Sequence, residues 1–263
     1  MTDSSPATPS VSTADGVLTI AVSNPANGTA LDDDAIAGAT AALIELREGR
    51  RDEQVILLVG AGKNFCAGGN VAAFAGAEDR PAYLLELADQ LHTMLGLINE
   101  TSLPVVVAAK GWAAGAGMSL TLIGDVVVGG TSTKMRPAYS GIGLTPDGGM
   151  TWTLPRTVGA ARARAIILTN RIVTAEQALE YGILSEIVDD ERVDERAREI
   201  AVELAAGPSA ALQATVGLLR QSPAASLSAQ FDAEGASISR LSGEPTGIEG
   251  VDAFLAKRAP QWP

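Results

Sequence analysis

Residues 104–125 read PVVVAAKGWAAGAGMSLTLIGD, and this stretch decides the fold. The apolar, β-branched run at 104–109 predicts a buried strand. Glycines then precede a helical segment at 119–123, so the first N–H groups of that helix have no intrahelical acceptor and are available to an anionic ligand atom. A dinucleotide-binding G-x-G-x-x-G pattern does not fit, because Leu120 stands at the third glycine position. The stretch predicts a strand, a glycine turn that faces a ligand, and a helix.

Similar units flank this stretch. Strands are expected at 17–22, 54–59 and 125–128, with helices at about 32–48 and 81–99 between them. After residue 159 the pattern is almost wholly helical, apart from a short strand at 182–188. The helices expected there are 160–169, 174–181, 191–206, 209–221, about 225–241 and 246–258. Strands that alternate with single helices predict an α/β core.

These patterns divide the chain without separating it into independent domains. We expect a disordered tail at 1–15, because that segment is polar and rich in Ser, Thr and Pro. A core at 16–200 and a helical region at 201–263 follow, with no low-complexity linker between them. The two parts are expected to form one continuous structural unit.

The composition excludes several classes of function. The 263 residues include 31 Asp and Glu against 19 Lys and Arg, a formal net charge of −12, which disfavours binding to nucleic acid or to an anionic membrane surface. The least polar stretch, 111–124, is shorter than the roughly 18 residues that span a bilayer. One cysteine, Cys66, and one histidine, His92, cannot form an internal disulfide or a zinc cage, so we expect no metal site. We expect a cytoplasmic protein without a targeting signal.

Two further glycine-rich segments could carry chemistry. GAGKNFCAGGN at 60–70 consists mostly of small residues, so its backbone can approach a ligand closely. It contains no Gly-Lys-Ser/Thr sequence, which excludes a Walker phosphate loop. YSGIGLTPDGG at 139–149 places Asp147 between a proline and two glycines. Taken singly, each of these segments could equally be a tight turn, and Asp147 a turn residue.

Together, in this order and spacing, the three segments resemble the crotonase superfamily, also called the enoyl-CoA hydratase/isomerase family. Further matching pieces are Asn24-Pro25 to Ala30-Leu31, Leu154-Pro-Arg-x-x-Gly159, Thr174 to Ile183 and Gly250 to Arg258. The resemblance covers nearly everything from Gly16 to the end. It implies a spiral of ββα units followed by a C-terminal helical region through which chains associate into homotrimers or hexamers. It also implies an acyl-CoA thioester substrate, with coenzyme A as part of the substrate and no separate cofactor.

The resemblance also implies roles for individual residues. The thioester carbonyl oxygen would bind between the backbone N–H groups of Ala67 and Ala116, which would stabilise an enolate. The positions that match substrate-binding residues are Asn27, Gly28, Gly68, Asn70, Gly115, Tyr139 and Lys257. In the family the first two positions line the coenzyme A channel, and the last can reach a coenzyme A phosphate. Asn70 stands where the family often has aspartate, and Tyr139 could line the acyl pocket or fill the core.

The two glutamates of the hydratases are missing. Enoyl-CoA hydratases activate water with both, and the matching positions here hold Ser119 and Tyr139, neither of which can act as a carboxylate base. Asp147 matches the single acid/base carboxylate of several isomerases of the family, and these isomerases look most similar. One carboxylate suffices to move a double bond, because it takes a proton from one carbon and returns it two carbons away.

We therefore expect an enoyl-CoA isomerase with Asp147 as acid/base. Two alternatives remain open: an enoyl-CoA hydratase, or another lyase, that uses an atypical base, and a catalytically silent acyl-CoA-binding trimer. We expect His92 to be a partly exposed helix residue and Cys66 a small packing residue, neither with a chemical role.

Overall fold

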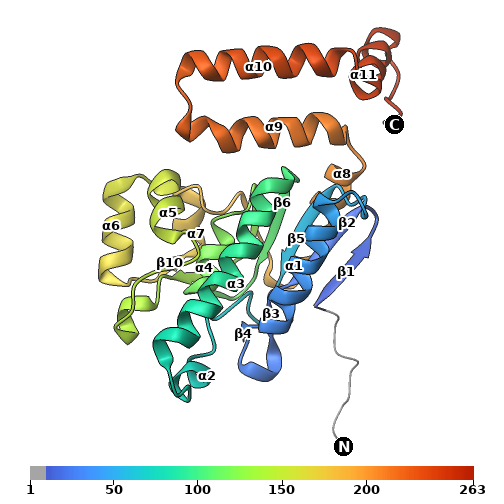
Figure 1. Cartoon of the computed structure of the whole chain (residues 1–263). Coiled ribbons are helices and arrows are strands. Elements are labelled where there is room, and N and C mark those ends of the chain that lie inside the picture. The colour runs from blue at the N-terminus through green and yellow to red at the C-terminus, as the bar shows by residue number, and fades with distance from the viewer. Residues whose placement is uncertain (1–9) are drawn as a thin grey trace, which may run out of the picture.

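A six-stranded sheet forms the centre of the molecule (Figure 1). The computed structural model describes residues 10–263. In spatial order the strands are β1 (Val11–Ala14), β2 (Val17–Ala21), β5 (Val55–Val59), β6 (Val105–Ala109), β8 (Val126–Gly130) and β11 (Glu186–Val188). All neighbouring pairs are parallel except β1 with β2. The expected α/β core is confirmed.

The prediction of a disordered tail is wrong for its last residues. β1 pairs antiparallel with β2, so that Val11 lies opposite Ile20. The turn between them, Asp15-Gly16, has positive φ at both residues (54° and 72°), which is the geometry of a tight two-residue hairpin. Most of β1 is exposed, so its residues can be polar, and the sequence pattern gives no sign of a strand there. Residues 1–9 of the expected tail lie outside the described residues.

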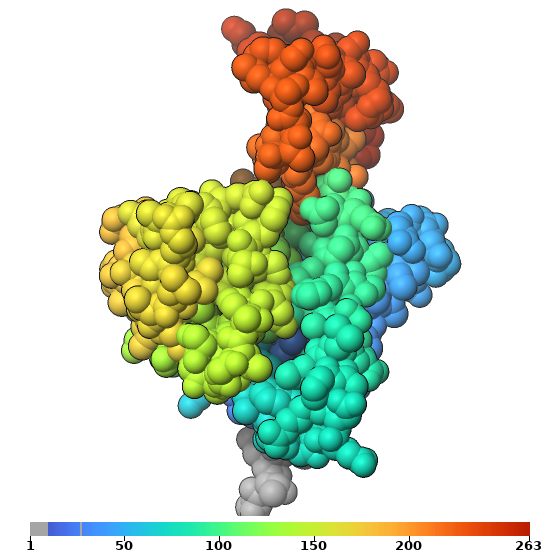
Figure 2. Space-filling model, turned by 60° about the vertical axis from the view of Figure 1, so that its left-hand side comes forward, coloured from blue at the N-terminus to red at the C-terminus, as the bar shows by residue number. Residues whose placement is uncertain are grey.

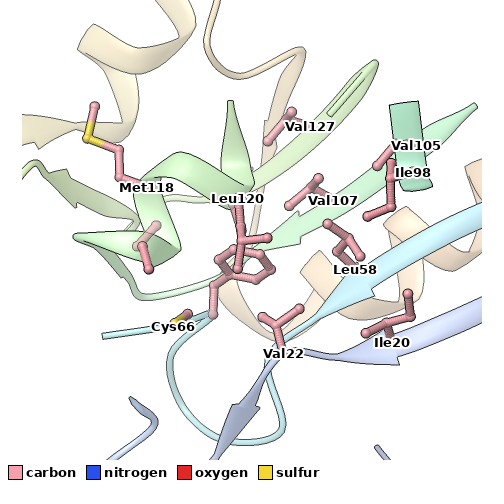
Figure 3. Packing of buried hydrophobic residues seen from close by; sticks show 14 of the residues in the cluster. Ile20, Val22, Leu58, Cys66, Ile98, Val105, Val107, Met118, Leu120 and Val127 are labelled. Atoms are coloured by element: carbon pink, nitrogen blue, oxygen red, sulfur yellow. The ribbon is translucent and has the colours of Figure 1, made fainter. Parts of the chain in front are cut away.

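The two faces of the sheet are covered by different helices. Alternate residues of β5 point to opposite faces, as the pleat requires. Ile56 and Leu58 join a core cluster with α1 (Asp33–Arg47) and α3 (Arg80–Thr101), part of which is seen in Figure 3. Val55 and Leu57 join a second cluster with α8 (Val193–Ala205). The near-continuous apolar strands are thus buried on both sides.

A repeating ββα unit builds the rest of the core. After β6 the chain forms β7 (Trp112–Ala114) and α4 (Ala116–Thr121), and after β8 it forms β9 (Lys134–Arg136) and α5 (Met150–Val158). β7 and β9 belong to a second, three-stranded sheet with β10 (Val173–Thr174). After β5 the corresponding place is taken by an isolated bridge between Cys66 and Ala113. Each unit therefore gives one strand, or one bridge, to each sheet.

Two C-terminal helices, α10 (Leu227–Ser242) and α11 (Pro245–Ala256), stand away from this core (Figures 1 and 2). Helix α9 (Ser209–Gln221) connects them to it, because Arg220 of α9 donates to the carbonyl oxygens of Ile98 and Leu103. The boundary expected at residue 200 instead falls inside α8, whose Ala197 and Ala201 are buried against the sheet.

The remaining elements are short or lie outside the central sheet. They are β3 (Ser23–Asn24), β4 (Ala30–Leu31), α2 (Val71–Ala75), α6 (Ala160–Thr169), α7 (Ala175–Glu180) and the 3-10 turns η1 (Pro25–Asn27), η2 (Tyr139–Ile142), η3 (Asp190–Arg192) and η4 (Ser222–Ala224).

No single helix within residues 10–263 is long and apolar enough to cross a membrane. One bent pair, Asp190–Ala205 with Ser209–Ala224, reaches the required length and composition only when its two helices are joined.

Candidate active site

The three glycine-rich segments meet at one cavity of about 370 Å³. Helices α2 and α3 form one side, and the segment 138–147 forms the other; these two sides face each other across a hollow in Figure 2. Its apolar lining residues are Leu31, Val71, Phe74, Leu84, Leu85, Leu87, Ala88, Leu91, Ala138, Ile142 and Leu144. Its remaining lining residues are Ala67, Gly68, Gly69, Gly115, Ala116, Tyr139, Thr145 and Asp147. The cavity is thus apolar with one polar end.

At the polar end, the chain segments around Cys66 and Ala114 are tied together through their backbones. The Cys66 N–H donates to the Trp112 carbonyl oxygen at 3.1 Å, and the Ala114 N–H donates to the Cys66 carbonyl oxygen at 2.9 Å. A Cβ at Gly117 would lie 2.2 Å from the Cys66 carbonyl oxygen, so only glycine permits this approach. These contacts bring the start of α4 beside Gly68 and Gly69.

The structure corrects the expected role of Ala67. Its N–H donates to the carbonyl oxygen of Thr29 at 2.9 Å and is therefore not free for a ligand. The Gly68 carbonyl oxygen accepts from Leu31 N–H at 2.8 Å. Because C=O and N–H of one trans peptide point in opposite directions, the Gly69 N–H points away from that contact. Among the described residues the Gly69 N–H has no acceptor, and Gly69 lines the cavity.

Ala116 lies where the sequence places it. It is the first residue of α4, and the preceding carbonyl oxygen, that of Gly115, accepts from the Ser119 N–H at 3.1 Å within the helix. The Ala116 N–H therefore points back out of the helix start, where it has no intrahelical acceptor. The N–H groups of Gly69 and Ala116, which have no acceptor among the described residues, thus border the polar end of the cavity.

Asp147 is the only charged residue among the described residues that line the cavity. The Tyr139 hydroxyl donates to its carboxylate oxygen Oδ1 at 2.5 Å. Burial raises the pKa of Tyr139, and the adjacent Asp147 carboxylate raises it further, so the phenol remains protonated and remains a donor. The Ser119 hydroxyl donates to the backbone carbonyl oxygen of Asp147 at 2.9 Å. Both positions that would hold hydratase glutamates therefore contact Asp147 instead.

The single histidine also reaches this turn. His92 Nε2 accepts a hydrogen bond from the Gly148 N–H at 3.1 Å. His92 is exposed on α3, as the sequence indicates, but no local pattern showed that it would meet a loop so far along the chain. Cys66 is a packing residue, as expected: it is fully buried, and burial raises the pKa of its thiol to about 12.

The other predicted binding residues have different locations. Gly68, Gly115 and Tyr139 line the cavity. Asn70 does not; its Oδ1 accepts from Ala73 N–H at 3.2 Å and caps α2. Asn27 is the last residue of η1, and Gly28 follows it with φ +67° and is likewise not a lining residue. Lys257 is exposed at the end of α11, in the C-terminal region that stands apart from the cavity (Figure 1).

The central parallel sheet, the ββα units and the C-terminal helices match the crotonase fold of solved structures. The family model described as enoyl-CoA hydratase/isomerase matches residues 12–263, and the chain belongs to this family. The resemblance inferred from the sequence is confirmed.

Known proteins similar to this chain differ in their reactions. It is 36% identical over 256 residues to the 1,2-epoxyphenylacetyl-CoA isomerase of Escherichia coli, covering 94% of this chain and 95% of that protein. It is 32% identical over 208 residues to the 2,3-dehydroadipyl-CoA hydratase of the same organism, covering 79% and 80%. The crystal structure of an enoyl-CoA hydratase from Polaromonas sp. JS666 superimposes with a TM-score of 0.90 at 29% identity, covering 96% and 98%.

Proposed function

We propose that this protein is an enoyl-CoA isomerase that moves a carbon–carbon double bond in an acyl-CoA thioester. The observation that carries the proposal is the single carboxylate, Asp147, which lines the same cavity as the N–H groups of Gly69 and Ala116. Ser119 and Tyr139, which replace the paired hydratase carboxylates, are both occupied in holding Asp147. This favours proton shuttling by one acid/base over the activation of water by two.

The proposed reaction has two proton transfers. Asp147 removes a proton from the carbon between the thioester and the double bond of a 3-enoyl-CoA, and the electron pair moves onto the carbonyl oxygen to form a dienolate. The N–H groups of Gly69 and Ala116 donate to that oxygen and stabilise its charge. The protonated Asp147 then returns the proton two carbons away, which gives the 2-enoyl-CoA. Coenzyme A enters as part of the substrate, and the reaction needs no separate cofactor.

The walls of the cavity indicate the class of acyl group. Leucines of α3 and Val71 and Phe74 of α2 surround its apolar end, and no Lys, Arg or His occurs among its lining residues in the described chain. An acyl group that ends in a carboxylate would be desolvated there without a cation and would share the cavity with Asp147. We infer that the substrate carries an uncharged, apolar acyl group, as the phenylacetyl-type name of one relative also suggests.

A thioester series tests the reaction and the acyl class separately. We expect conversion of 3-hexenoyl-CoA to 2-hexenoyl-CoA and little hydration of crotonyl-CoA. Binding of hexanoyl-CoA is expected to exceed that of adipoyl-CoA by at least about 10-fold, the factor that roughly 1.4 kcal/mol of unfavourable desolvation gives. Efficient hydration without isomerisation would favour the hydratase alternative, and binding without either turnover would favour the silent binder.

A substitution at the cavity wall sharpens the test of the acyl class. Leu85 lines the cavity yet is 63% exposed, so Leu85→Arg adds a cation there without opening the core. It should increase affinity for adipoyl-CoA and not for hexanoyl-CoA. Leu168→Arg is the matched control, because Leu168 is 77% exposed on α6 and does not line the cavity.

We further propose that the chain assembles as a homotrimer or a dimer of trimers. Large apolar side chains are exposed on the C-terminal helices: Leu227 (69%), Phe231 (61%), Ile238 (73%), Phe254 (82%) and Leu255 (73%). Apolar surface of this kind on protruding helices is typical of an interface. Such an assembly would also allow Lys257 to approach the cavity of a neighbouring subunit. Light scattering at micromolar concentration tests this, and a monomeric mass would contradict it.

A further inference from the structure

One peptide group next to the proposed base is held on both of its sides. The peptide that joins Asp147 to Gly148 accepts the Ser119 hydroxyl at its carbonyl oxygen, at 2.9 Å. Its N–H donates to His92 Nε2 at 3.1 Å. Ser119 belongs to α4 and His92 to α3, so two helices from different parts of the chain form hydrogen bonds to the same peptide group.

These two contacts restrict the rotation of that plane. Because the peptide is planar and trans, its C=O and N–H point in opposite directions, and two hydrogen bonds on opposite sides oppose its rotation about the Cα–Cα axis. The same two hydrogen bonds tie the turn to α4 and α3, and so fix the position of the Asp147 Cα from which the carboxylate projects. Gly148 has φ +58°, and a Cβ there would lie 2.8 Å from Ser119 Cβ, so the turn also packs tightly against α4.

We propose that His92 is a positioning residue for Asp147: by accepting the Gly148 N–H, it keeps the carboxylate aimed into the cavity. This inference rests on the proposed role of Asp147 as the acid/base. Tyr139 orients the carboxylate itself, whereas His92 and Ser119 orient the backbone that carries it. Proton transfer depends steeply on such alignment, because displacements of about 1 Å can reduce rates roughly 100-fold.

The contact requires a defined form of the imidazole. A backbone N–H can only donate, so Nε2 must be the unprotonated nitrogen and Nδ1 must carry the proton. His92 is the single histidine of the chain, so histidine labelled with nitrogen-15 gives one pair of imidazole signals that need no assignment by mutation. We expect the nitrogen-15 spectrum of the uncharged imidazole to show the Nδ1–H form. The Nε2–H form would overturn the inference without reference to activity.

Kinetics test the positioning role itself. His92→Leu removes the acceptor, and kcat should fall roughly 10-fold while KM changes less than about two-fold, since binding is left in place. His92→Gln restores an acceptor near the Nε2 position and should recover most of kcat. Gln90→Leu is the control, because it makes the same kind of change on an exposed residue of α3 that has no hydrogen bond to the turn.

The outcomes separate this inference from the proposed function. Wild-type kcat in His92→Leu would overturn the positioning role, even if Asp147→Asn abolishes isomerisation. Equal losses of kcat in His92→Gln and His92→Leu would overturn it as well. If Asp147→Asn keeps full activity, the proposed function fails, and the positioning role fails with it. A loss in His92→Leu that is accompanied by an equal loss in Gln90→Leu would indicate damage to α3 and would contradict the inference.

Discussion

The two sides of the polar end of the cavity are built in different ways. On one side, Gly69 and Ala116 offer backbone N–H groups, and main-chain hydrogen bonds such as that from Ala114 to Cys66 hold them in place. On the other side, Asp147 offers a side chain, and the side chains of Ser119, Tyr139 and His92 hold it. The backbone side should therefore tolerate side-chain deletions but not added volume, whereas the carboxylate side should respond to each deletion.

The largest effect is expected from Asp147→Asn. Asparagine keeps the size and the turn but cannot accept a proton, so kcat for double-bond migration should fall about 10²–10⁴-fold. Binding of a saturated acyl-CoA, followed by calorimetry, should change little because the backbone donors are untouched. Isomerisation within a few-fold of wild type would return Asp147 to the role of a turn residue.

On the backbone side, Gly117→Ala should have the next largest effect. The added methyl group would meet the Cys66 carbonyl oxygen at 2.2 Å, so α4 must move away from the Gly68–Gly69 segment and Ala116 with it. Losing one aligned oxyanion donor reduces kcat by about 10²-fold, and overpacking lowers the free energy of unfolding by roughly 1–3 kcal/mol. Kinetics together with urea unfolding measure both.

A second glycine provides the control for this substitution. A methyl group added at Gly96 of α3 would have no atom of another element within 4 Å, so Gly96→Ala should leave kcat unchanged. It should raise the free energy of unfolding by roughly 0.5–1 kcal/mol, because alanine is the better helix former. Equal kinetic losses in both variants would mean that close approach at Gly117 is not what aligns the donors.

Tyr139→Phe should have an intermediate effect. The ring is retained, so the cavity wall is preserved, but the carboxylate of Asp147 loses its hydroxyl donor. We expect kcat to fall roughly 10-fold with little change in binding, about the value of one hydrogen bond to a charged group. Unchanged kcat would show that the backbone contacts of the turn suffice to orient Asp147.

The same tyrosine gives a pH-dependent effect on stability. Its pKa is raised in the folded protein, so above about pH 10 the unfolded chain releases a proton that the folded chain retains. The free energy of unfolding should therefore fall with rising pH above about 10, and this part of the fall should be absent in Tyr139→Phe. Urea unfolding of wild type and Tyr139→Phe at about pH 9 and pH 10.5 measures this difference in the free energy of unfolding. An equal fall in both proteins between the two pH values would contradict the prediction.

The smallest effect is expected from Ala116→Gly. Its donor is a main-chain N–H that the substitution keeps, so kcat should stay within about two-fold of wild type. A large loss would show that the Ala116 methyl group, and not only its backbone, shapes the cavity.

The sequence predicts the regular parts of the fold well. The helices at 160–169 and 209–221 match the observed bounds of α6 and α9, since their periodicity is strong and local. The sequence does not predict β7 and β9, because three-residue strands carry no periodicity of their own. It does not predict helix α5 either, because Pro155 lies inside that helix and proline normally argues against one.

The site can be predicted from the sequence only in part, because contacts between distant segments leave no local pattern. The sequence locates the small-residue segment at 60–70, but which of its N–H groups is free depends on Thr29, which engages Ala67. It locates Asp147, but not the contact of the adjacent Gly148 with His92. Composition and spacing identify which segments approach a ligand; pairings between distant segments decide which atoms do.

The packing of Gly148 on Ser119 has a consequence for how this active site can evolve. Ser119 is fully buried, and the turn already fills the space into which a glutamate at that position would extend. A lineage that acquired this glutamate by a single mutation would have to displace the turn that carries Asp147. Under the proposed mechanism it would lose proton shuttling before it gained water addition. We therefore expect the two positions to be epistatic, so that the helix residue and the turn have to change together.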